Sequence, residues 1–319
     1  MATIHEGDLL WQPSAEDIAR ANLTDYMRWL RDERGLDFDD YPALWRWSVE
    51  RLEEFWGSVW DYSGVLASQH GSTVLAERAM PGAQWFPGAR LNYAENIFRK
   101  RSAERPMIFY QAEGQPVVTL SWEEVLDQSQ RLAAALRRMG VQAGDRVVGY
   151  LPNVPEAIVA LLAAASIGAI WSCCAPDFGT RSVLDRFTQI APSVLIATDG
   201  YQYGGKPFDR RAIVGELQAA LPSLRQTILL PRLSAAPLPN TILWADALAA
   251  PVAPADYQFA QLPFEHPLWI LYSSGTTGLP KPIVQGHGGI LLEHLKALTF
   301  HNDIKAEDRF FWFTSTGWM

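Results

Sequence analysis

Hydrophobic residues recur at helical spacing over about the first 85 residues of the chain. Segment 14–34 begins at Ser14 with acidic residues in its first turn, which predicts a capped helix. Segment 41–61 predicts a second helix, because its large apolar residues form a stripe. The stripe consists of Leu44, Trp47, Leu52, Phe55 and Trp56. Such a stripe forms hydrophobic core more often than a ligand site, so we expect core here.

From about residue 105 the pattern changes to short apolar runs that alternate with helical segments. Ser121 and Glu124 predict a capping box before an amphipathic helix, and Gly140 stands where a helix C-cap glycine belongs. The segments that follow alternate in character: RVVGYL, PEAIVALLAAASIG, AIWSCC, LDRFTQI, SVLIAT, AIVGELQAAL and TILL. Strands separated by helices indicate βαβ units. The sequence therefore predicts an α/β fold, with mostly parallel sheets covered by helices on both faces.

These patterns divide the chain into four expected parts. Residues 1–85 form a helical N-terminal region, and residues 86–230 form a first α/β subdomain. Residues 231–264 are rich in proline and alanine and predict a connector, while residues 265–319 begin a second α/β subdomain at PLWILY. That subdomain stops in FFWFTSTGWM before its sheet is complete. We therefore expect a truncated chain that exposes apolar surface.

Composition and charge exclude some functions. Hydrophobic residues make up 48% and charged residues 19% of the 319 residues, which is typical of a globular protein. The formal net charge is -8. Nucleic acids and anionic membrane surfaces both require a basic face, so neither is an expected partner.

The cysteines and the N-terminus bear on the compartment. Cys173 and Cys174 are adjacent, and adjacent cysteines seldom bridge, so we expect both to be reduced and buried. The first residues, MATIHEGD, lack the features of a signal peptide, and the longest apolar stretch is too short to span a bilayer. We expect a cytoplasmic protein.

The stretch YSSGTTGLPK at 272–281 is the densest candidate for ligand chemistry. Its glycines let backbone N–H groups approach an anion, its hydroxyls add donors, and Lys281 adds a positive charge. These features are typical of a phosphate cradle. The stretch is not a Walker A box, because Pro280 stands five residues after Gly275, and GHGG at 286–289 lacks the third glycine of a dinucleotide fingerprint. A generic glycine-rich turn is the alternative interpretation.

YSSGTTGLPK closely resembles the phosphate-binding signature of the acyl-adenylate-forming superfamily, which includes acyl-CoA synthetases, luciferases and peptide-synthetase adenylation domains. The matching residues are Ser273, Ser274, Gly275, Thr276, Thr277, Gly278, Pro280 and Lys281. The resemblance implies the large-domain fold of these enzymes. It also implies that the loop holds the β- and γ-phosphates of ATP while a carboxylate attacks the α-phosphorus. Lys281 is the leading catalytic candidate, since a cation and backbone donors stabilise a departing pyrophosphate.

Other segments resemble the short-chain acyl-CoA synthetases of that superfamily, and most closely their acetoacetyl-CoA synthetase branch. They are LWQPSAEDIARANLTDYMRWL, WFPGARLNYAENIF, WSCCAPDFG and TSTGWM. The resemblance implies a ligase that converts acetoacetate, ATP and CoA to acetoacetyl-CoA, AMP and pyrophosphate through an acyl-adenylate, with Mg²⁺ as a cofactor. Two alternatives stay open: a synthetase for acetate or propionate, and a non-catalytic nucleotide-binding module on a truncated ligase scaffold.

The resemblance also suggests roles for a few further residues. Trp318 and Met319 fall where an aromatic residue walls the carboxylate pocket of the family, with core packing as the alternative. Lys206 falls where a basic residue contacts CoA phosphates, although the neighbouring basic position is Tyr203 here. His287 either belongs to the site or caps the helix that follows it.

The resemblance covers only about the N-terminal half of such an enzyme. The family's adenine loop, ribose-binding aspartate, metal-binding glutamate and main catalytic lysine correspond to positions beyond Met319. No metal ligand is assignable in this chain for that reason. We expect the 319 residues alone to be inactive.

Overall fold

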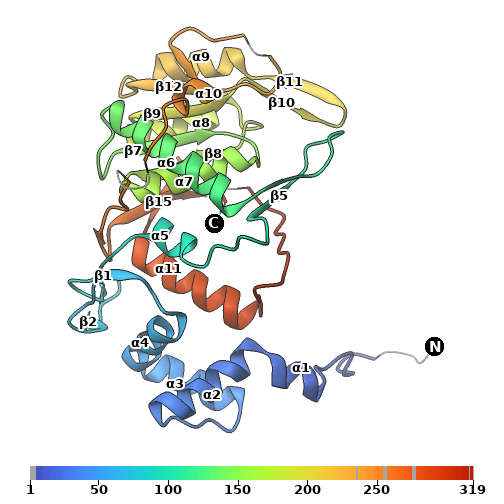
Figure 1. Ribbon diagram of the computed structural model, residues 1–319, viewed down its shortest axis with the longest axis vertical. Coiled ribbons are helices and arrows are strands. Elements are labelled where there is room, and N and C mark those ends of the chain that lie inside the picture. The colour runs from blue at the N-terminus through green and yellow to red at the C-terminus, as the bar shows by residue number, and fades with distance from the viewer. Residues whose placement is uncertain (1–4, 235, 254–256, 275–277, 316, 319) are drawn as a thin grey trace. The chain divides into compact units, whose positions relative to one another are not determined.

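The structure of the protein is a computed structural model (Figure 1), and it describes residues 5–234, 236–253, 257–274, 278–315, 317 and 318. The chain divides into two compact units. The first comprises Met1–Val65, Val74–Gln84 and Leu291–Trp312, and the second comprises Leu66–Thr73, Trp85–Ile290 and Phe313–Met319. These limits differ from those of the four parts expected from the sequence, whose boundaries stay a prediction.

A seven-stranded sheet organises the second unit. Its strands lie in the order β13-β12-β9-β7-β8-β15-β16, and every neighbouring pair is parallel except β15 with β16. The strands are β7 (Arg146–Tyr150), β8 (Ile170–Cys174), β9 (Val194–Thr198), β12 (Gln226–Leu230), β13 (Thr241–Leu243), β15 (Pro267–Ser273) and β16 (Lys281–Gly286). The predicted α/β fold with a mostly parallel sheet is confirmed.

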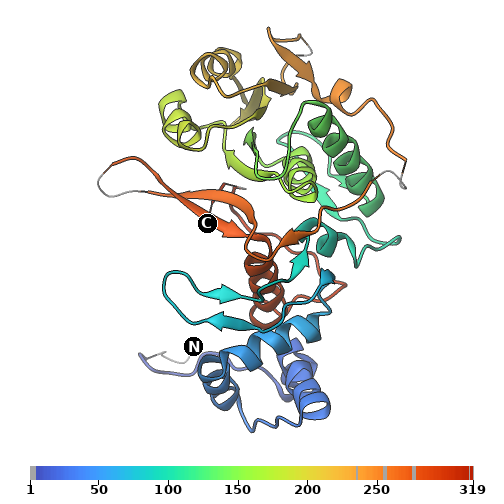
Figure 2. The same ribbon diagram turned by 90° about the vertical axis from the view of Figure 1, so that its left-hand side faces the viewer.

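Helices cover both faces of this sheet (Figure 2). The helices α6 (Trp122–Arg138) and α7 (Pro155–Ser166) lie on one face, and α8 (Thr180–Phe187) and α9 (Arg211–Ala220) lie on the other. Alternate strand residues point toward the α8–α9 layer, because successive side chains of a strand face opposite ways. The core cluster there includes Val148, Tyr150, Cys174, Leu195, Ala197, Val183, Phe187, Val214 and Leu217.

The ends of α6 are set by capping residues that lie next to them in the sequence. The Ser121 hydroxyl accepts the backbone N–H of Glu124, and the Glu124 carboxylate accepts the backbone N–H of Ser121. At the other end Gly140 adopts a φ of 80°, and the N–H of Val141 donates to the carbonyl of Leu136. Both the predicted capping box and the predicted C-terminal glycine are confirmed.

Shorter elements complete the description. They are α5 (Tyr93–Phe98), a 3₁₀ turn (Thr188–Ile190), α10 (Trp244–Ala247), α11 (His287–Lys296) with a π turn (Ala297–His301), β1 (Ala67–Gln69), β2 (Leu75–Glu77), β3 (Gln84–Trp85), β4 (Arg90–Leu91), β5 (Ile108–Tyr110), β6 (Val118–Leu120), β10 (Gly200–Tyr203), β11 (Lys206–Asp209) and β14 (Leu262–Pro263). β10 pairs antiparallel with β11, and β5 with β6.

The N-terminal part of the first unit contains α1 (Ala15–Arg20), α2 (Asn22–Arg34), α3 (Tyr41–Glu50) and α4 (Leu52–Ser63), and the unit also includes most of α11 and the π turn. Each long helical segment expected from the sequence is broken once, at Ala21 and at Arg51. Asn22 explains the first break. Its backbone N–H donates to Asp303, and its side-chain amide donates to the carbonyls of Thr299 and Ile304. These long-range bonds fix the start of α2.

Cys173 and Cys174 are buried, as predicted, and neither forms a disulfide. Burial raises the pKa of the Cys174 thiol above its ordinary value, so this thiol is protonated at neutral pH. Within the described ranges, every helix is too short or too polar to cross a bilayer.

Ser121→Ala is expected to lower the free energy of unfolding by about 1 kcal/mol, because it removes the N-cap of a helix whose apolar face is buried. Ser14→Ala is the matched control. It removes the same capping box from α1, which buries no side chain, so the unfolding free energy should change by less than about 0.5 kcal/mol. Urea titration followed by circular dichroism measures both. Equal losses would contradict the link between the α6 cap and the core.

Candidate functional site

The stretch predicted to be a phosphate cradle lies in the hairpin between β15 and β16. Ser273 ends β15 and pairs with Lys281, the first residue of β16. Ser274, Gly278 and Lys281 are exposed. The hairpin extends beyond the sheet (Figure 2). Gly275, Thr276 and Thr277 lie outside the described residues. The predicted strand and turn thus hold a lysine and a serine opposite each other at the base of the loop.

Both ends of this loop contact the end of α8 and the 3₁₀ turn that follows it. The Tyr272 hydroxyl donates to the carbonyl of Arg186 over 2.9 Å, and the Arg186 guanidinium lies 5.7 Å from the centre of the Tyr272 ring. The Gln189 side-chain amide donates to the carbonyl of Pro280 over 3.0 Å. Burial raises the pKa of Tyr272, so its hydroxyl remains a donor at neutral pH.

Residues 313–315, 317 and 318 lie at the carboxyl edge of the same sheet. The Asn153 side chain, which follows β7, donates to the carbonyl of Thr314. A Cβ on Gly317 would lie 2.3 Å from the carbonyl oxygen of Cys173 in β8, so only glycine allows this approach. Trp318 follows directly and is 74% exposed. Met319 lies outside the described residues. Because β8 and β15 are parallel neighbours, Trp318 and the hairpin belong to the same edge of the sheet.

A pocket of about 600 Å³ opens at this edge, among the loops that follow β7, β9 and β12. Its lining residues include Tyr110, Asn153, Tyr201, Tyr203 and Arg232. The Arg232 guanidinium donates to the Tyr110 hydroxyl over 2.6 Å and lies 5.7 Å from the centre of that ring. The pocket therefore combines aromatic faces with a cation, which suits a ligand that has both a flat ring and an anionic group.

Asp199 holds the loop after β12, which lines this pocket, and the sequence analysis missed this residue. Its buried carboxylate accepts the backbone N–H groups of Arg232, Leu233 and Ser234 at 2.6–3.2 Å. Gly200 follows it, and a Cβ there would lie 2.3 Å from the Leu233 side chain. The signal was an aspartate and a glycine directly after the apolar run SVLIAT, a position where functional loops begin in parallel sheets.

Lys206 begins β11, is exposed, and pairs with Tyr203 across a tight turn. Gly204 and Gly205 form that turn with φ values of 59° and 73°, which glycine adopts without strain. The backbone N–H of Gly205 donates to Glu113 over 2.8 Å. Because Tyr203 lines the pocket, Lys206 stands in the hairpin that borders it.

His287 is buried at the start of α11. Its Nδ1 accepts the backbone N–H of Tyr93 over 3.1 Å, and its own backbone N–H donates to the carbonyl of His266. Burial and, to a smaller extent, the nearby His266 ring lower the pKa of His287 from 6.5 to about 3. The side chain is therefore neutral. These contacts support its structural interpretation, in which it fixes the start of the helix that follows the hairpin.

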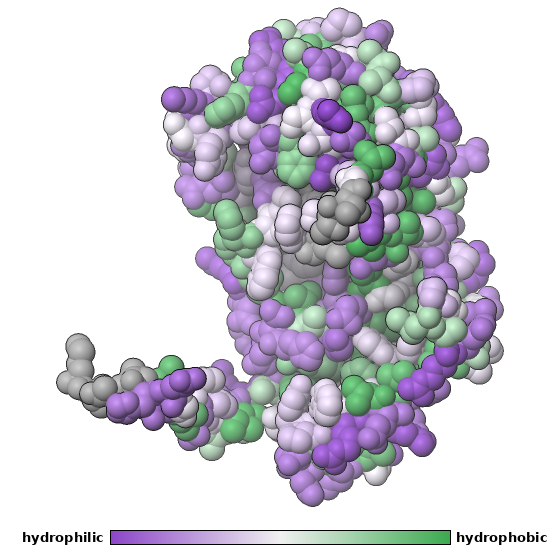
Figure 3. All heavy atoms as spheres, turned by 180° about the vertical axis from the view of Figure 1, so that it is seen from behind, coloured by the Kyte–Doolittle hydropathy of each residue, from purple (hydrophilic) through white to green (hydrophobic). Residues whose placement is uncertain are grey.

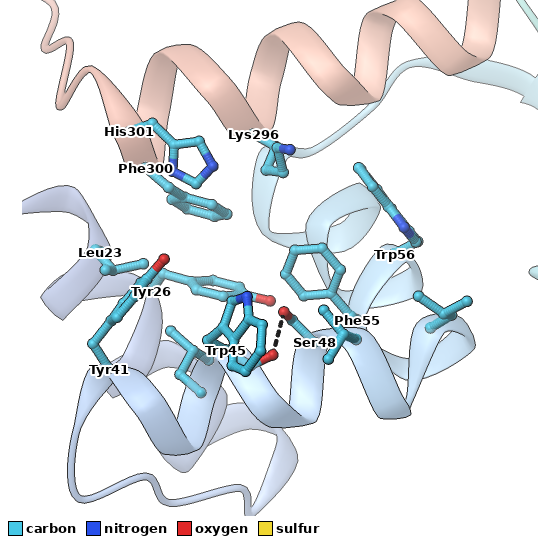
Figure 4. Close-up of a pocket in the computed structure, with 13 residues that line it drawn as sticks. Leu23, Tyr26, Tyr41, Trp45, Ser48, Phe55, Trp56, Lys296, Phe300 and His301 are labelled. Atoms are coloured by element: carbon cyan, nitrogen blue, oxygen red, sulfur yellow. Dashed lines mark hydrogen bonds between the residues drawn. The ribbon is translucent and has the colours of Figure 1, made fainter.

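The first unit has a pocket of its own, of about 340 Å³ (Figure 4). Its wall includes Leu44, Leu52, Phe55 and Trp56, so the stripe expected to be core also lines an open hollow. Lys296 lies over the Trp56 ring at 5.6 Å and pairs with Glu293 at 2.8 Å. None of the predicted site residues lies here. On the face shown in Figure 3, hydrophobic side chains likewise interleave with hydrophilic ones.

Metal chemistry has no evident centre in this part of the protein. Across the described ranges, no group of three or more histidine, cysteine, aspartate or glutamate side chains could hold a metal ion.

Two protein families match the sequence. The family described as AMP-binding enzyme matches residues 96–319, and the family described as acetyl-coenzyme A synthetase N-terminus matches residues 41–97. The first match covers the sheet, the hairpin and the larger pocket.

The similar proteins are named as CoA synthetases. The acetoacetyl-coenzyme A synthetase of Rhizobium meliloti (strain 1021) is 42% identical, over 97% of this chain and 48% of that protein. The malonamoyl-CoA synthetase vrtB of Penicillium aethiopicum is 33% identical, over 98% of this chain and 45% of that protein. The solved structure of the acetoacetyl-CoA synthetase from Streptomyces lividans is 51% identical with a TM-score of 0.93, over 97% of this chain and 48% of that one. The chain spans about half the length of the relatives it matches.

His287→Gln is expected to weaken the pH dependence of stability. A histidine whose pKa is lowered by folding takes up a proton only in the unfolded state between about pH 6.5 and about pH 3, so wild-type stability falls as pH falls through that window. As pH falls through this window, the free energy of unfolding of the variant should decrease by up to about 1.4 kcal/mol less per pH unit than that of the wild type. Urea titrations at several pH values measure the slope. The exposed His301→Gln is the control, and equal slopes in all three proteins would refute the effect.

Proposed function

The chain belongs to the AMP-binding enzyme family, and from this premise we propose that it is the N-terminal part of an ATP-dependent acid–thiol ligase. The reaction converts acetoacetate, ATP and CoA to acetoacetyl-CoA, AMP and pyrophosphate through an acyl-adenylate. The names of the relatives from Rhizobium meliloti and Streptomyces lividans support this substrate. A ligase for acetate, propionate or another short acid uses the same chemistry and is the alternative.

The hairpin between β15 and β16 carries the proposal. Ser273 and Lys281 face each other at the base of a loop rich in hydroxyls and glycines, at the carboxyl edge of a parallel sheet. In the proposed reaction Ser273, Ser274, Gly275, Thr276, Thr277 and Gly278 supply hydrogen-bond donors to the phosphates of ATP. Lys281 balances the charge that develops on the departing pyrophosphate. No covalent acyl-enzyme is needed, because positioning and charge stabilisation suffice for adenylation.

The acid and CoA have proposed positions at the same edge. Trp318 and Met319 wall the pocket of a small carboxylate, where a large side chain shortens the space available to the acid. Lys206 contacts a CoA phosphate. The pocket beside its hairpin supports this role, because Tyr110, Tyr203 and Arg232 offer aromatic faces and a cation to the nucleotide part of CoA.

Mg²⁺ belongs to the proposed reaction, but the described residues do not fit it, since they contain no cluster of ligands. We propose that its ligands lie in the half of the relatives' length that this chain does not span. We also propose a cytoplasmic location, supported by two buried cysteines that form no disulfide.

Exchange of labelled pyrophosphate into ATP by the product of the complete gene tests the adenylation step. Acetoacetate should drive the exchange, and Lys281→Met should slow it about 100-fold, because the departing pyrophosphate loses its cation. The mutation should leave the fold intact, since Lys281 is exposed. If acetate drives the exchange and acetoacetate does not, the proposed substrate is wrong. If no acid that is tested drives the exchange, the proposed function is wrong. The 319-residue chain is the negative control, with no steady formation of acyl-CoA expected.

Lys206→Met is expected to raise the KM for CoA about fivefold, because one exposed charge-assisted hydrogen bond to a phosphate is lost. The KM for acetoacetate and the rate of pyrophosphate exchange should not change, since neither involves CoA. Lys281→Met is the matched comparison, because it also removes an exposed lysine from the first residue of a hairpin strand. Steady-state kinetics of acyl-CoA formation give the two KM values, and the exchange of labelled pyrophosphate into ATP gives the exchange rate. An unchanged KM for CoA would remove Lys206 from the site.

A further inference from the structure

The loop between β15 and β16 is fastened at both ends to one short piece of the chain. Before the loop, the Tyr272 hydroxyl donates to the backbone carbonyl of Arg186 over 2.9 Å. After the loop, the carbonyl of Pro280 accepts the side-chain amide of Gln189 over 3.0 Å. The two partners are three residues apart, so both attachments come from the same side of one helical segment.

That segment is itself rigidly held. Arg186 stacks between two rings, with its guanidinium 5.0 Å from the centre of Phe178 and 5.7 Å from that of Tyr272, and it donates to the carbonyl of Ser182. Phe187, the next residue, is fully buried in the core cluster under β7 and β8. The segment therefore fixes the ends of the loop relative to the sheet.

The long-range hydrogen bond of the exposed Gln189 side chain is not explained by a contribution to folding stability. Its side chain is exposed, yet its amide donates to both Asp185 and Pro280. The bond to Asp185 lies within the helix end, whereas the bond to Pro280 spans 91 residues and reaches the last residue before Lys281. An exposed bond of this kind adds little to stability, but it fixes where the strand with the lysine begins.

We infer that Tyr272 and Gln189 are positioning residues, which fasten the two ends of the phosphate loop to segment 186–189. The inference rests on the proposed function, because it concerns the donors that meet pyrophosphate. Donors stabilise developing charge only where they are held in place before the reaction. Losing either attachment lets the loop sample other positions and lowers the rate of the step that uses those donors.

Gln189→Ala in the complete gene product tests the attachment after the loop. The kcat/KM for ATP in pyrophosphate exchange should fall about fivefold, with the KM for acetoacetate unchanged, because one anchoring hydrogen bond is lost. Gln189→Lys keeps a donor within reach of the Pro280 carbonyl and should restore most of the rate. Gln218→Ala is the matched control. Its side-chain amide also donates to a proline carbonyl, that of Pro239, but on α9 and away from the loop.

Tyr272→Phe tests the attachment before the loop without changing the ring. It should lower kcat/KM for ATP by a similar factor, since it removes only the hydroxyl that bonds to Arg186. Hydrogen exchange of the ligand-free protein gives a readout that does not depend on catalysis. The peptide spanning 272–282 should exchange faster in Tyr272→Phe and Gln189→Ala than in the wild type or Gln218→Ala.

The outcomes separate this inference from the proposed function. If the wild-type protein exchanges pyrophosphate but neither variant differs from it, the inference is wrong and the proposed function stands. A loss that Gln189→Lys does not restore, without faster hydrogen exchange, also contradicts the positioning role. If the wild type shows no exchange with any acid, the proposed function fails, and faster hydrogen exchange in the variants still reports whether the loop is fastened as described.

Discussion

The close approach of β7, β8 and β15 is the constraint on which the second unit depends. Trp171 of β8 is 1% exposed, and its indole lies over Gly149 of β7, where a Cβ would come within 2.8 Å of the ring. On its other side Trp171 pairs in parallel register with Trp269 of β15. A side chain at position 149 would push the indole away from β7. Because β15 leads directly into the hairpin, this contact sets where the hairpin leaves the sheet.

The loops at the carboxyl edge of the sheet are positioned by the strands that precede them. Parallel strands joined by helices deliver their following loops to one edge, although the loops are far apart in the sequence. The loop after β12 is held there by the Asp199 carboxylate at the end of β9, and Gly317 approaches the backbone of β8 closely. The hairpin is held by segment 186–189. Each of these segments is therefore attached to a different strand or helix of the same core.

Local chemistry explains what the sequence could predict. The capping box at Ser121 and the glycine at 140 lie within a few residues of the helix ends that they define, and the apolar runs of a parallel sheet are continuous. The sequence analysis did not predict β16, which contains Pro282; as an edge strand of the sheet it tolerates a proline. The break between α1 and α2, the Asp199 contacts and the Gln189 bond depend on partners 33 to 282 residues away. No local pattern contains that information.

The overall charge of the chain does not decide which anions it binds. The formal net charge is -8, whereas both nucleotides of the proposed reaction are polyanions. Exposed charges are screened over about 8 Å at physiological ionic strength, so a phosphate at the hairpin responds mainly to Lys281 and to nearby donors. A nucleic acid must lie along many surface carboxylates and is repelled by them. A small anion meets only the local cradle, and this is how an acidic protein can exclude one class of phosphate ligand and admit another.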